Sequence, residues 1–219
     1  MRSEATAGYD ILYNIIRHRS SIRKLKPDPI PEETLKKIID AGIHSPSGGN
    51  LQDWAFILVR DAEGKRFIRD RYWGTWQKLQ GGRPQPANLP PAQQRVLQAA
   101  AHLAEYLDEV PVILLACARK EYPPFARAGY DRASVATVHG SIYPAVQNIM
   151  LACRALGLGT VITTIHCCFE EELKQHLGIP AEVEVSALLP IGYPQGKFGP
   201  TTRKPADGII HWDRWGQQG

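Results

Sequence analysis

Arginines with neighbouring hydroxyl groups are the residues of this sequence best suited to bind a phosphorylated ligand. Arg19, Ser20, Ser21 and Arg23 stand close together in the segment RHRSSIRKLK, and Arg203 stands far along the chain in GPTTRKP. A guanidinium group offers a rigid fork of N–H donors that matches phosphate oxygens in pairs. The three arginines and their hydroxyl neighbours therefore indicate function through a bound cofactor rather than through a catalytic triad.

A second polar group follows in the segment SPSGGNLQDW, which contains Ser47, Gly48, Gly49, Asn50 and Gln52. Glycines let the backbone come close to a ligand, and amide side chains can form hydrogen bonds with its carbonyl oxygens and ring nitrogens. The same residue types also favour an ordinary turn. We favour a binding segment because Gln52 and Trp54 lead directly into an apolar run that is typical of a buried strand.

The basic run from Arg17 to Lys26 has two other interpretations, a solvated face and a nucleic-acid patch. Ile22 and Leu25 interrupt its charges, and the whole chain is nearly balanced, with 26 basic residues, 22 acidic residues and a formal net charge of +4. A dedicated nucleic-acid binder is expected to carry a more one-sided charge. The sequence therefore argues against nucleic acid as a partner and places phosphate binding slightly ahead of a solvated face.

The composition indicates a single folded domain. The 219 residues are 43% apolar, which is sufficient for a full hydrophobic core. The most apolar stretches, 111–118 and 185–192, are far too short to span a bilayer. The first residues, MRSEATAGYD, contain an acid and no apolar run, so they do not resemble a signal peptide. We therefore expect a cytoplasmic protein with no membrane partner.

Familiar motifs for nucleotides and metals do not occur in the sequence. It has neither G-x-G-x-x-G after a strand nor a P-loop, and it has no paired zinc spacing. The four cysteines, Cys117, Cys153, Cys167 and Cys168, have no regular spacing, so we expect free and mostly buried thiols. We likewise expect His166, Cys167 and Cys168 to be buried residues rather than metal ligands.

Hydrophobic spacing predicts the elements that must hold these residues. Helices are expected at 9–18, about 31–44, about 92–108, about 134–156 and 169–177, and strands at 55–60, 111–118, 160–164 and 182–192. The first strand should be buried on both faces. Residues 81–92 predict a long loop, and the aromatic residues of 65–93 and 119–133 either pack in the core or cover a substrate. This order is typical of an α+β fold.

Three segments together resemble the FMN-dependent nitroreductase family. Residues 17–59 resemble its opening, with an arginine-serine-x-arginine segment, a proline-led helix and a P-S-x-x-N-x-Q pattern. GSIYPAVQNIMLACRALGLGTVITT resembles its long central helix ending in GLGT, and IGYPQGKFGPTTRKP resembles its C-terminal arginine segment. The resemblance runs in the right order from about Tyr9 to Trp215.

The resemblance implies an architecture as well as a family. The expected fold is a nitroreductase-like three-layer α/β/α sandwich, in which helices flank a central, mostly antiparallel sheet. Residues 1–219 would form one FMN-binding domain and would assemble as an intertwined homodimer with two cofactor sites at its interface. The C-terminal extension at 193–219 would wrap the partner subunit, which agrees with its apolar content.

The resemblance also implies which residues bind FMN. Arg19, Ser21 and Arg23, with Ser20 beside them, would hold the phosphate and ribityl chain, and Arg203 would reach the phosphate. Pro46, Ser47, Gly48 and Asn50 would come from the partner subunit to the isoalloxazine or ribityl group, with Gln52 near the ring. Thr163 and Thr164 would lie against the flavin.

Three positions depart from the family pattern. Asp53 stands where the family has a proline, and Thr163-Thr164 stands where several members have an acid and a glycine. Thr201 stands where a lysine is often found. These changes bear on the redox potential and the subgroup rather than on FMN binding.

The implied activity is an oxidoreductase that passes hydride from NADH or NADPH through the flavin to a small acceptor. Nitroaromatics, quinones and activated alkenes are the acceptor classes that the resemblance suggests. Because the flavin carries the chemistry, no catalytic side chain is expected. Two alternatives stay open: an oxygen-dependent flavin dehydrogenase, and a flavin-binding sensor or storage protein with little turnover.

Overall fold

The computed structural model describes residues 4–81 and 89–217. The chain divides into two compact units, which are described separately: Met1–Ser20 with Phe198–Gly219, and Ser21–Lys197. Most of the loop predicted at 81–92 lies outside the described residues. Gly81 still belongs to a helix, and Pro91 already begins the next one.

A four-stranded sheet forms the centre of the unit Ser21–Lys197. Its strands, in spatial order, are β1 (Trp54–Val59), β2 (Val112–Arg119), β4 (Val183–Gly192) and β3 (Gly159–Thr160). Each neighbouring pair is antiparallel, and Leu115 of β2 pairs with Ile57 on one side and with Leu188 on the other. The central antiparallel sheet expected from the resemblance is confirmed.

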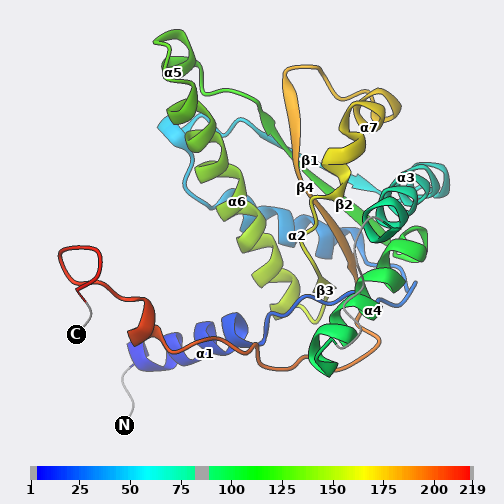
Figure 1. Cartoon of the computed structure of the whole chain (residues 1–219), viewed down its shortest axis with the longest axis horizontal. Helices are drawn as coiled ribbons and strands as arrows, with labels where there is room; N and C mark the ends of the chain where they lie inside the picture. The colour runs from blue at the N-terminus through cyan, green and yellow to red at the C-terminus, as the bar shows by residue number, and fades with distance from the viewer. Residues whose placement is uncertain (1–3, 82–88, 218–219) are drawn as a thin grey trace. The chain divides into compact units, whose positions relative to one another are not determined.

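Helices cover both faces of this sheet and make three layers (Figure 1). One face is covered by α2 (Glu32–Ile43) and α6 (Asp131–Ala155), the other by α3 (Ala62–Gly81), α4 (Pro91–Glu105) and α7 (Glu170–Leu177). Successive residues of a strand point to opposite faces. Leu114 of β2 therefore lies in the core cluster of α2 and α6, and Ile113 in the cluster of α3, α4 and α7. The expected α/β/α sandwich is confirmed.

The prediction that the first strand is buried on both faces is wrong for this chain. β1 lies at the edge of the sheet, and most of its residues are only half-buried, whereas β2 is buried along almost its whole length. An edge strand has a hydrogen-bonded neighbour on one side only, so the helices of both layers cover it less completely. The apolar run of β1 resembled that of a central strand because composition does not report the strand order.

The long helix α3 was not predicted from the sequence. This helix places Ile68 and Tyr72 in the buried core, and Trp73 and Trp76 pack against the same cluster. Ile68, Tyr72 and Trp76 follow helical spacing, but charged residues and Gly74 break up the apolar stripe around them. For these two tryptophans the structure favours packing over the alternative of a substrate cover.

Two further expectations need correction. The third strand is shorter than predicted, because β3 covers only Gly159–Thr160 and Thr163 joins the sheet through an isolated bridge to Leu188. A short helix, α5 (Pro123–Arg127), also occupies part of the segment that was expected to be irregular.

The cysteines divide into a buried and an exposed pair. Cys117 and Cys153 are free thiols in the core, and burial raises the pKa of each to about 12, so they stay protonated and unreactive. Cys167 and Cys168 are free as well, but both are exposed, so their expected burial is wrong. His166 is buried as predicted. Among the described residues no group of His, Cys, Asp and Glu is arranged to hold a metal.

The other unit is built on helix α1 (Glu4–His18), along which the C-terminal segment runs (Figure 1). The backbone N–H of Thr201 donates to the carbonyl oxygen of Arg17 over 2.9 Å. Many of the apolar residues of this unit are exposed in the single chain, among them Tyr9, Ile11, Leu12, Trp212 and Trp215. No helix in the described ranges is long and apolar enough to cross a membrane.

Candidate functional site

The segment Ser21–Lys26 is held against β3 and against the residues that follow β4. Ser21 forms a parallel bridge with Thr160, and the N–H of Ile22 donates to the Thr160 carbonyl oxygen over 3.0 Å. Gly159 permits this close approach, because a Cβ atom there would lie 2.7 Å from Cγ2 of Ile22. The fold thus brings Ser21 and Ile22 beside the GLGT segment, although more than 130 residues separate them in the sequence.

Thr160 has a hydroxyl group that the described part of the chain leaves unsatisfied. Its side chain is 3% exposed, and its Oγ1 atom has no hydrogen-bond partner among the described residues. A buried polar atom without a partner costs free energy, so such atoms in native proteins usually have a reason. Here the atom lies beside Ser21, where the resemblance implies a ligand rich in oxygen atoms.

Arg23, Tyr72 and Thr163 form a second cluster in the same unit. The hydroxyl groups of Tyr72 and Thr163 are hydrogen-bonded over 2.7 Å, and the Arg23 guanidinium lies close enough to influence the pKa of Tyr72. Burial lowers the pKa of the half-buried Arg23, but a guanidinium group remains charged at neutral pH. A fixed positive charge and two hydroxyl groups therefore meet at one place.

Two arginines meet in the other unit. Arg19 is half-buried, and both burial and the neighbouring charge of Arg203 lower its pKa. Arg203 donates from Nη1 to the carbonyl oxygen of Thr202 over 2.7 Å. Two guanidinium groups held together repel each other, and an anion bound between them would relieve this repulsion.

The loop from Ser47 to Gln52 is a compact turn fixed by its own hydrogen bonds. The N–H of Gln52 donates to Oγ of Ser47 over 2.9 Å, and Nε2 of Gln52 donates to Oδ1 of Asn50 over 3.2 Å. The backbone adopts positive φ at three of its residues, Gly49 (58°), Asn50 (55°) and Gln52 (53°). Glycine accepts such angles freely, whereas the other two residues adopt them at a cost in free energy.

Helix α6 and Tyr122 hold this loop from one side. The N–H of Gly48 donates to Oγ of Ser141 over 3.0 Å, and Ser141 in turn donates to the carbonyl oxygen of Thr137 over 2.8 Å. A Cβ atom on Gly48 would overlap the methyl group of Thr137, and one on Gly49 would lie 2.8 Å from the Tyr122 hydroxyl. The two glycines are therefore needed for close packing as well as for turning.

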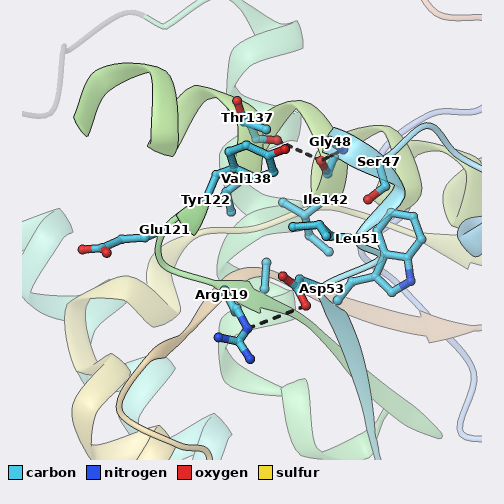
Figure 2. Close-up of a pocket in the computed structure, with 13 residues that line it drawn as sticks. Ser47, Gly48, Leu51, Asp53, Arg119, Glu121, Tyr122, Thr137, Val138 and Ile142 are labelled. Carbon is cyan, nitrogen blue, oxygen red and sulfur yellow. Dashed lines mark hydrogen bonds and ion pairs between the residues drawn. The ribbon is translucent and has the colours of Figure 1, made fainter. Parts of the chain in front are cut away.

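A pocket lies between this loop and α6, with about 330 Å³ of empty space, part of which is open solvent. Figure 2 shows Gly48 near Thr137 at one side of the pocket, and the Asp53–Arg119 ion pair at the other. Nε of Arg119 lies 3.6 Å from Oδ1 of Asp53, and both side chains are largely exposed. Asp53 thus ties the end of the loop to the end of β2.

The twelve predicted site residues fall into three groups. Ser21 pairs with Thr160, Arg23 and Thr163 lie close to Tyr72, and Thr164 is exposed. Arg19 and Ser20 belong to the unit that contains Arg203. Pro46, Ser47, Gly48, Asn50 and Gln52 lie on or beside the strained loop.

The residues that support these groups were not predicted from the sequence. Tyr72, Thr160, Tyr122, Thr137 and Ser141 all make their contacts with residues far away in the sequence. No local pattern marks such contacts. Only Tyr72 could have been found from the sequence. It stands four residues after the core residue Ile68, and residues at this spacing lie on the same face of a helix.

Comparison of the sequence with known proteins identifies a family. The nitroreductase family model matches residues 16–193. A protein of Thermus thermophilus named NADH dehydrogenase is 30% identical over 203 residues, which cover 89% of this chain and 92% of that protein. Iodotyrosine deiodinase 1 of Rattus norvegicus is 31% identical over 192 residues, which cover 83% of this chain and 61% of the rat protein.

Solved structures agree with the family match at the level of the fold. An iodotyrosine deiodinase bound to FMN and 3-iodo-L-tyrosine superposes with a TM-score of 0.74 at 23% identity, over 93% of this chain and 100% of that one. A BluB-like flavoprotein from Clostridium difficile 630 gives a TM-score of 0.71 at 21% identity, over 93% of this chain and 99% of that one. Since the family model spans most of the sequence and the fold agrees with it, the chain belongs to the nitroreductase family.

Proposed function

We propose that the protein is an FMN-dependent oxidoreductase that takes hydride from NADH or NADPH and passes it to a small acceptor. Membership of the nitroreductase family carries the coarser part of this statement, a flavin-dependent oxidoreductase. The choice of nicotinamide and acceptor is the proposed part. Nitroaromatics, quinones and activated alkenes are the acceptor classes we expect.

The observation that carries the proposal is the pairing of Ser21 with Thr160. It holds Ser21 beside Thr160, and the nearby residues Arg23 and Thr163 of the same two segments both lie close to the Tyr72 hydroxyl group. The hydroxyl group of Thr160 is buried and has no partner within the described residues. The chemistry of this donor set fits the phosphate, the ribityl hydroxyl groups and the ring edge of FMN.

The chain's own residues supply binding and position. FMN, when bound, supplies a ring that accepts a hydride from one substrate and gives it to another. We assign phosphate binding to Arg19 and Arg203, whose like charges are best neutralised by an anion. Arg23, Ser21 and Thr163 would hold the ribityl chain and the ring edge. The loop from Ser47 to Gln52, with Pro46 before it, would cover the cofactor of a partner subunit.

A homodimer with 193–219 wrapped around the partner is part of the proposal. It is supported by the apolar residues that the single chain leaves exposed on α1 and on the C-terminal segment, such as Leu12, Ile209 and Trp215. Several exposed apolar side chains close together in one part of a protein are typical of a protein interface. A monomer that binds FMN tightly would contradict this assembly.

The first test is the visible spectrum of the purified protein with FMN added. We expect a tight yellow complex that NADH or NADPH bleaches in the absence of oxygen, with the colour restored by an acceptor such as a quinone. A protein that gains no yellow colour on addition of FMN would refute the proposal. A yellow protein that neither nicotinamide bleaches would favour a sensor, or a dehydrogenase that uses oxygen.

Reductive dehalogenation is a second candidate, favoured by the relatives named iodotyrosine deiodinase in both sequence and structure comparisons. 3-Iodo-L-tyrosine is the probe for it. If the protein is a dehalogenase, the chemically reduced flavoprotein should be reoxidised anaerobically by this compound and should release iodide. If quinones reoxidise the reduced flavoprotein and 3-iodo-L-tyrosine does not, the result favours the first candidate, an oxidoreductase that uses NADH or NADPH and a small acceptor.

A further inference from the structure

The buried hydroxyl of Tyr72 has a single hydrogen-bond partner. Tyr72 is 4% exposed and packs in the core between α3 and the sheet. Within the described residues its hydroxyl group forms one hydrogen bond, of 2.7 Å, to Oγ1 of Thr163. Thr163 belongs to the segment that we assign to the flavin, whereas Tyr72 lies on a helix to which we assign no cofactor contact.

The surroundings of Tyr72 decide which hydroxyl donates. If Thr163 donated its hydrogen, the Tyr72 hydrogen would need another acceptor, and among the described residues this hydroxyl group has no second hydrogen-bond partner. The charged neighbour of Tyr72 is the Arg23 guanidinium, which has only donors and cannot accept a hydrogen bond. Because an unmade hydrogen bond is costly in a buried site, Tyr72 donates and Thr163 Oγ1 accepts.

This direction leaves the Thr163 hydrogen available. A hydroxyl group has one hydrogen and two lone pairs, so Thr163 can accept from Tyr72 and still donate elsewhere. The Thr163 backbone is fixed as well, since its N–H and carbonyl oxygen both pair with Leu188, over 3.0 and 3.1 Å. Thr163 is half-buried, and its neighbour Thr164 is exposed. The free hydrogen is thus held at the boundary between core and solvent.

The protonation state of Tyr72 agrees with a permanent donor. Burial raises the pKa of Tyr72, and the opposing effects of Thr163 and Arg23 are smaller. A tyrosine whose pKa lies above its ordinary value of about 10 keeps its hydrogen throughout the neutral range. The hydrogen bond to Thr163 therefore keeps its direction at all pH values at which the protein is expected to work.

We propose that Tyr72 is a positioning residue, whose hydroxyl group orients Thr163 so that the Thr163 hydrogen points to an acceptor atom at the ring edge of the bound flavin. This inference rests on the proposed function. Tyr72 itself does not touch the cofactor in this arrangement. Its effect is transmitted by one hydrogen bond from a helix in the outer layer.

The test compares Tyr72→Phe with Thr163→Val in FMN titrations of the apoprotein. Each change removes one side of the hydrogen bond and retains the shape of the side chain. We expect each to raise the FMN dissociation constant about three- to ten-fold, the scale of one hydrogen bond. The double variant should lose no more than either single variant, because both act through the same contact. The absorption bands of the bound flavin and its midpoint potential should shift in all three.

Tyr143→Phe is the matched control, since the Tyr143 hydroxyl also makes a hydrogen bond, to the Ser186 carbonyl oxygen over 3.0 Å. It should lower the stability of the protein much as Tyr72→Phe does, but leave the FMN dissociation constant and the flavin spectrum unchanged. Thr163→Ser, which keeps the hydroxyl group, should retain most of the wild-type affinity.

The outcomes separate this inference from the function on which it rests. A wild-type protein that binds no FMN refutes the proposed function. A wild-type protein that binds FMN, with a Tyr72→Phe variant of the same affinity and spectrum, overturns only the role of Tyr72. If Tyr72→Phe does not fold, Thr163→Val decides, and wild-type affinity and spectrum in that variant would overturn the role equally.

Discussion

The arginine pair Arg19–Arg203 and the loop Ser47–Gln52 hold predicted cofactor residues in different ways. Arg19 and Arg203 are kept close although their charges repel, so the unfavourable element of that region is electrostatic. The loop carries no charge, and its unfavourable element is conformational, because Asn50 and Gln52 adopt positive φ. The comparison shows that one group of predicted cofactor residues is disfavoured by like charges and the other by backbone geometry.

The largest effect is expected at Arg203. Arg203→Ala should weaken FMN binding by about 1.5–3 kcal/mol, the scale of hydrogen bonds to a charged group. The free energy of unfolding of the apoprotein should stay constant or rise, because the repulsion of Arg19 is removed. Fluorescence titration with FMN and urea unfolding measure the two quantities.

Lys204→Ala serves as the control for Arg203→Ala, since it removes an adjacent exposed charge that we do not assign to the cofactor. Retention of wild-type affinity by Arg203→Ala would remove Arg203 from the site. Equal losses of stability and affinity would mean that Arg203 is structural and that the electrostatic half of the comparison is mistaken.

At Gly48 the expected loss is one of stability. Gly48→Ala should lower the free energy of unfolding by about 1–3 kcal/mol, because the new methyl group overlaps that of Thr137 on a stiff helical residue. A second change, Thr137→Ser, removes the overlapping methyl group and should restore most of the loss. Urea unfolding of the apoprotein is the measurement.

Gly140→Ala is the matched change for Gly48→Ala, because Gly140 lies in α6 and nothing lies within 4 Å of the position of its Cβ atom. It should raise stability by about 0.5–1 kcal/mol through the helix propensity of alanine. If Gly48→Ala behaves like Gly140→Ala, the loop is not held by close packing on α6.

A substitution of Gln52 is expected to change the stability of the loop and the affinity for FMN in opposite directions. Gln52→Gly should raise the free energy of unfolding by roughly 0.5–1 kcal/mol, because glycine accepts the φ of 53° without strain but loses more entropy on folding. FMN affinity should fall, since the amide side chain is lost. A variant that is less stable than the wild type would show that the positive φ stores no strain.

The smallest effect is expected at Asp53. Asp53→Asn should lower stability by about 0.2–1 kcal/mol at low ionic strength and by less at high salt, because the ion pair with Arg119 is exposed. Urea unfolding at two salt concentrations measures the difference. A loss as large as that of Gly48→Ala would mean that the ion pair, rather than packing on α6, anchors the loop.

Much of the fold follows from local patterns in the sequence. The strand β2, the long helix α6 and the helix α7 lie close to their predicted positions, since each has an apolar run or stripe of the right period and clear stop signals. The helix α3 was missed because charged residues surround its core positions. The edge position of β1 could not be predicted, since the strand order depends on pairings between segments distant in the sequence.

The predicted cofactor residues stay a prediction, and the residues that support them could not be predicted. Arg23 and Thr163 were named from the family resemblance, and in the structure each lies close to the Tyr72 hydroxyl group. Tyr72, which joins them, was not named, because one tyrosine in an aromatic segment carries no mark of a hydrogen bond to a residue 91 positions later. Ser141 was missed for the same reason, since its contact with Gly48 spans 93 positions.

The sheet order has a consequence for the synthesis of the protein on the ribosome. β2 ends at Arg119, and its central partner β4 runs from Val183 to Gly192. The central ladder therefore cannot form until residue 192 has emerged, and at the usual pace of translation the backbone N–H and C=O groups on that edge of β2 wait for several seconds without partners. Contacts between distant segments also slow folding itself. We expect the nascent chain to depend on chaperones during this interval, more than a helical protein of equal length.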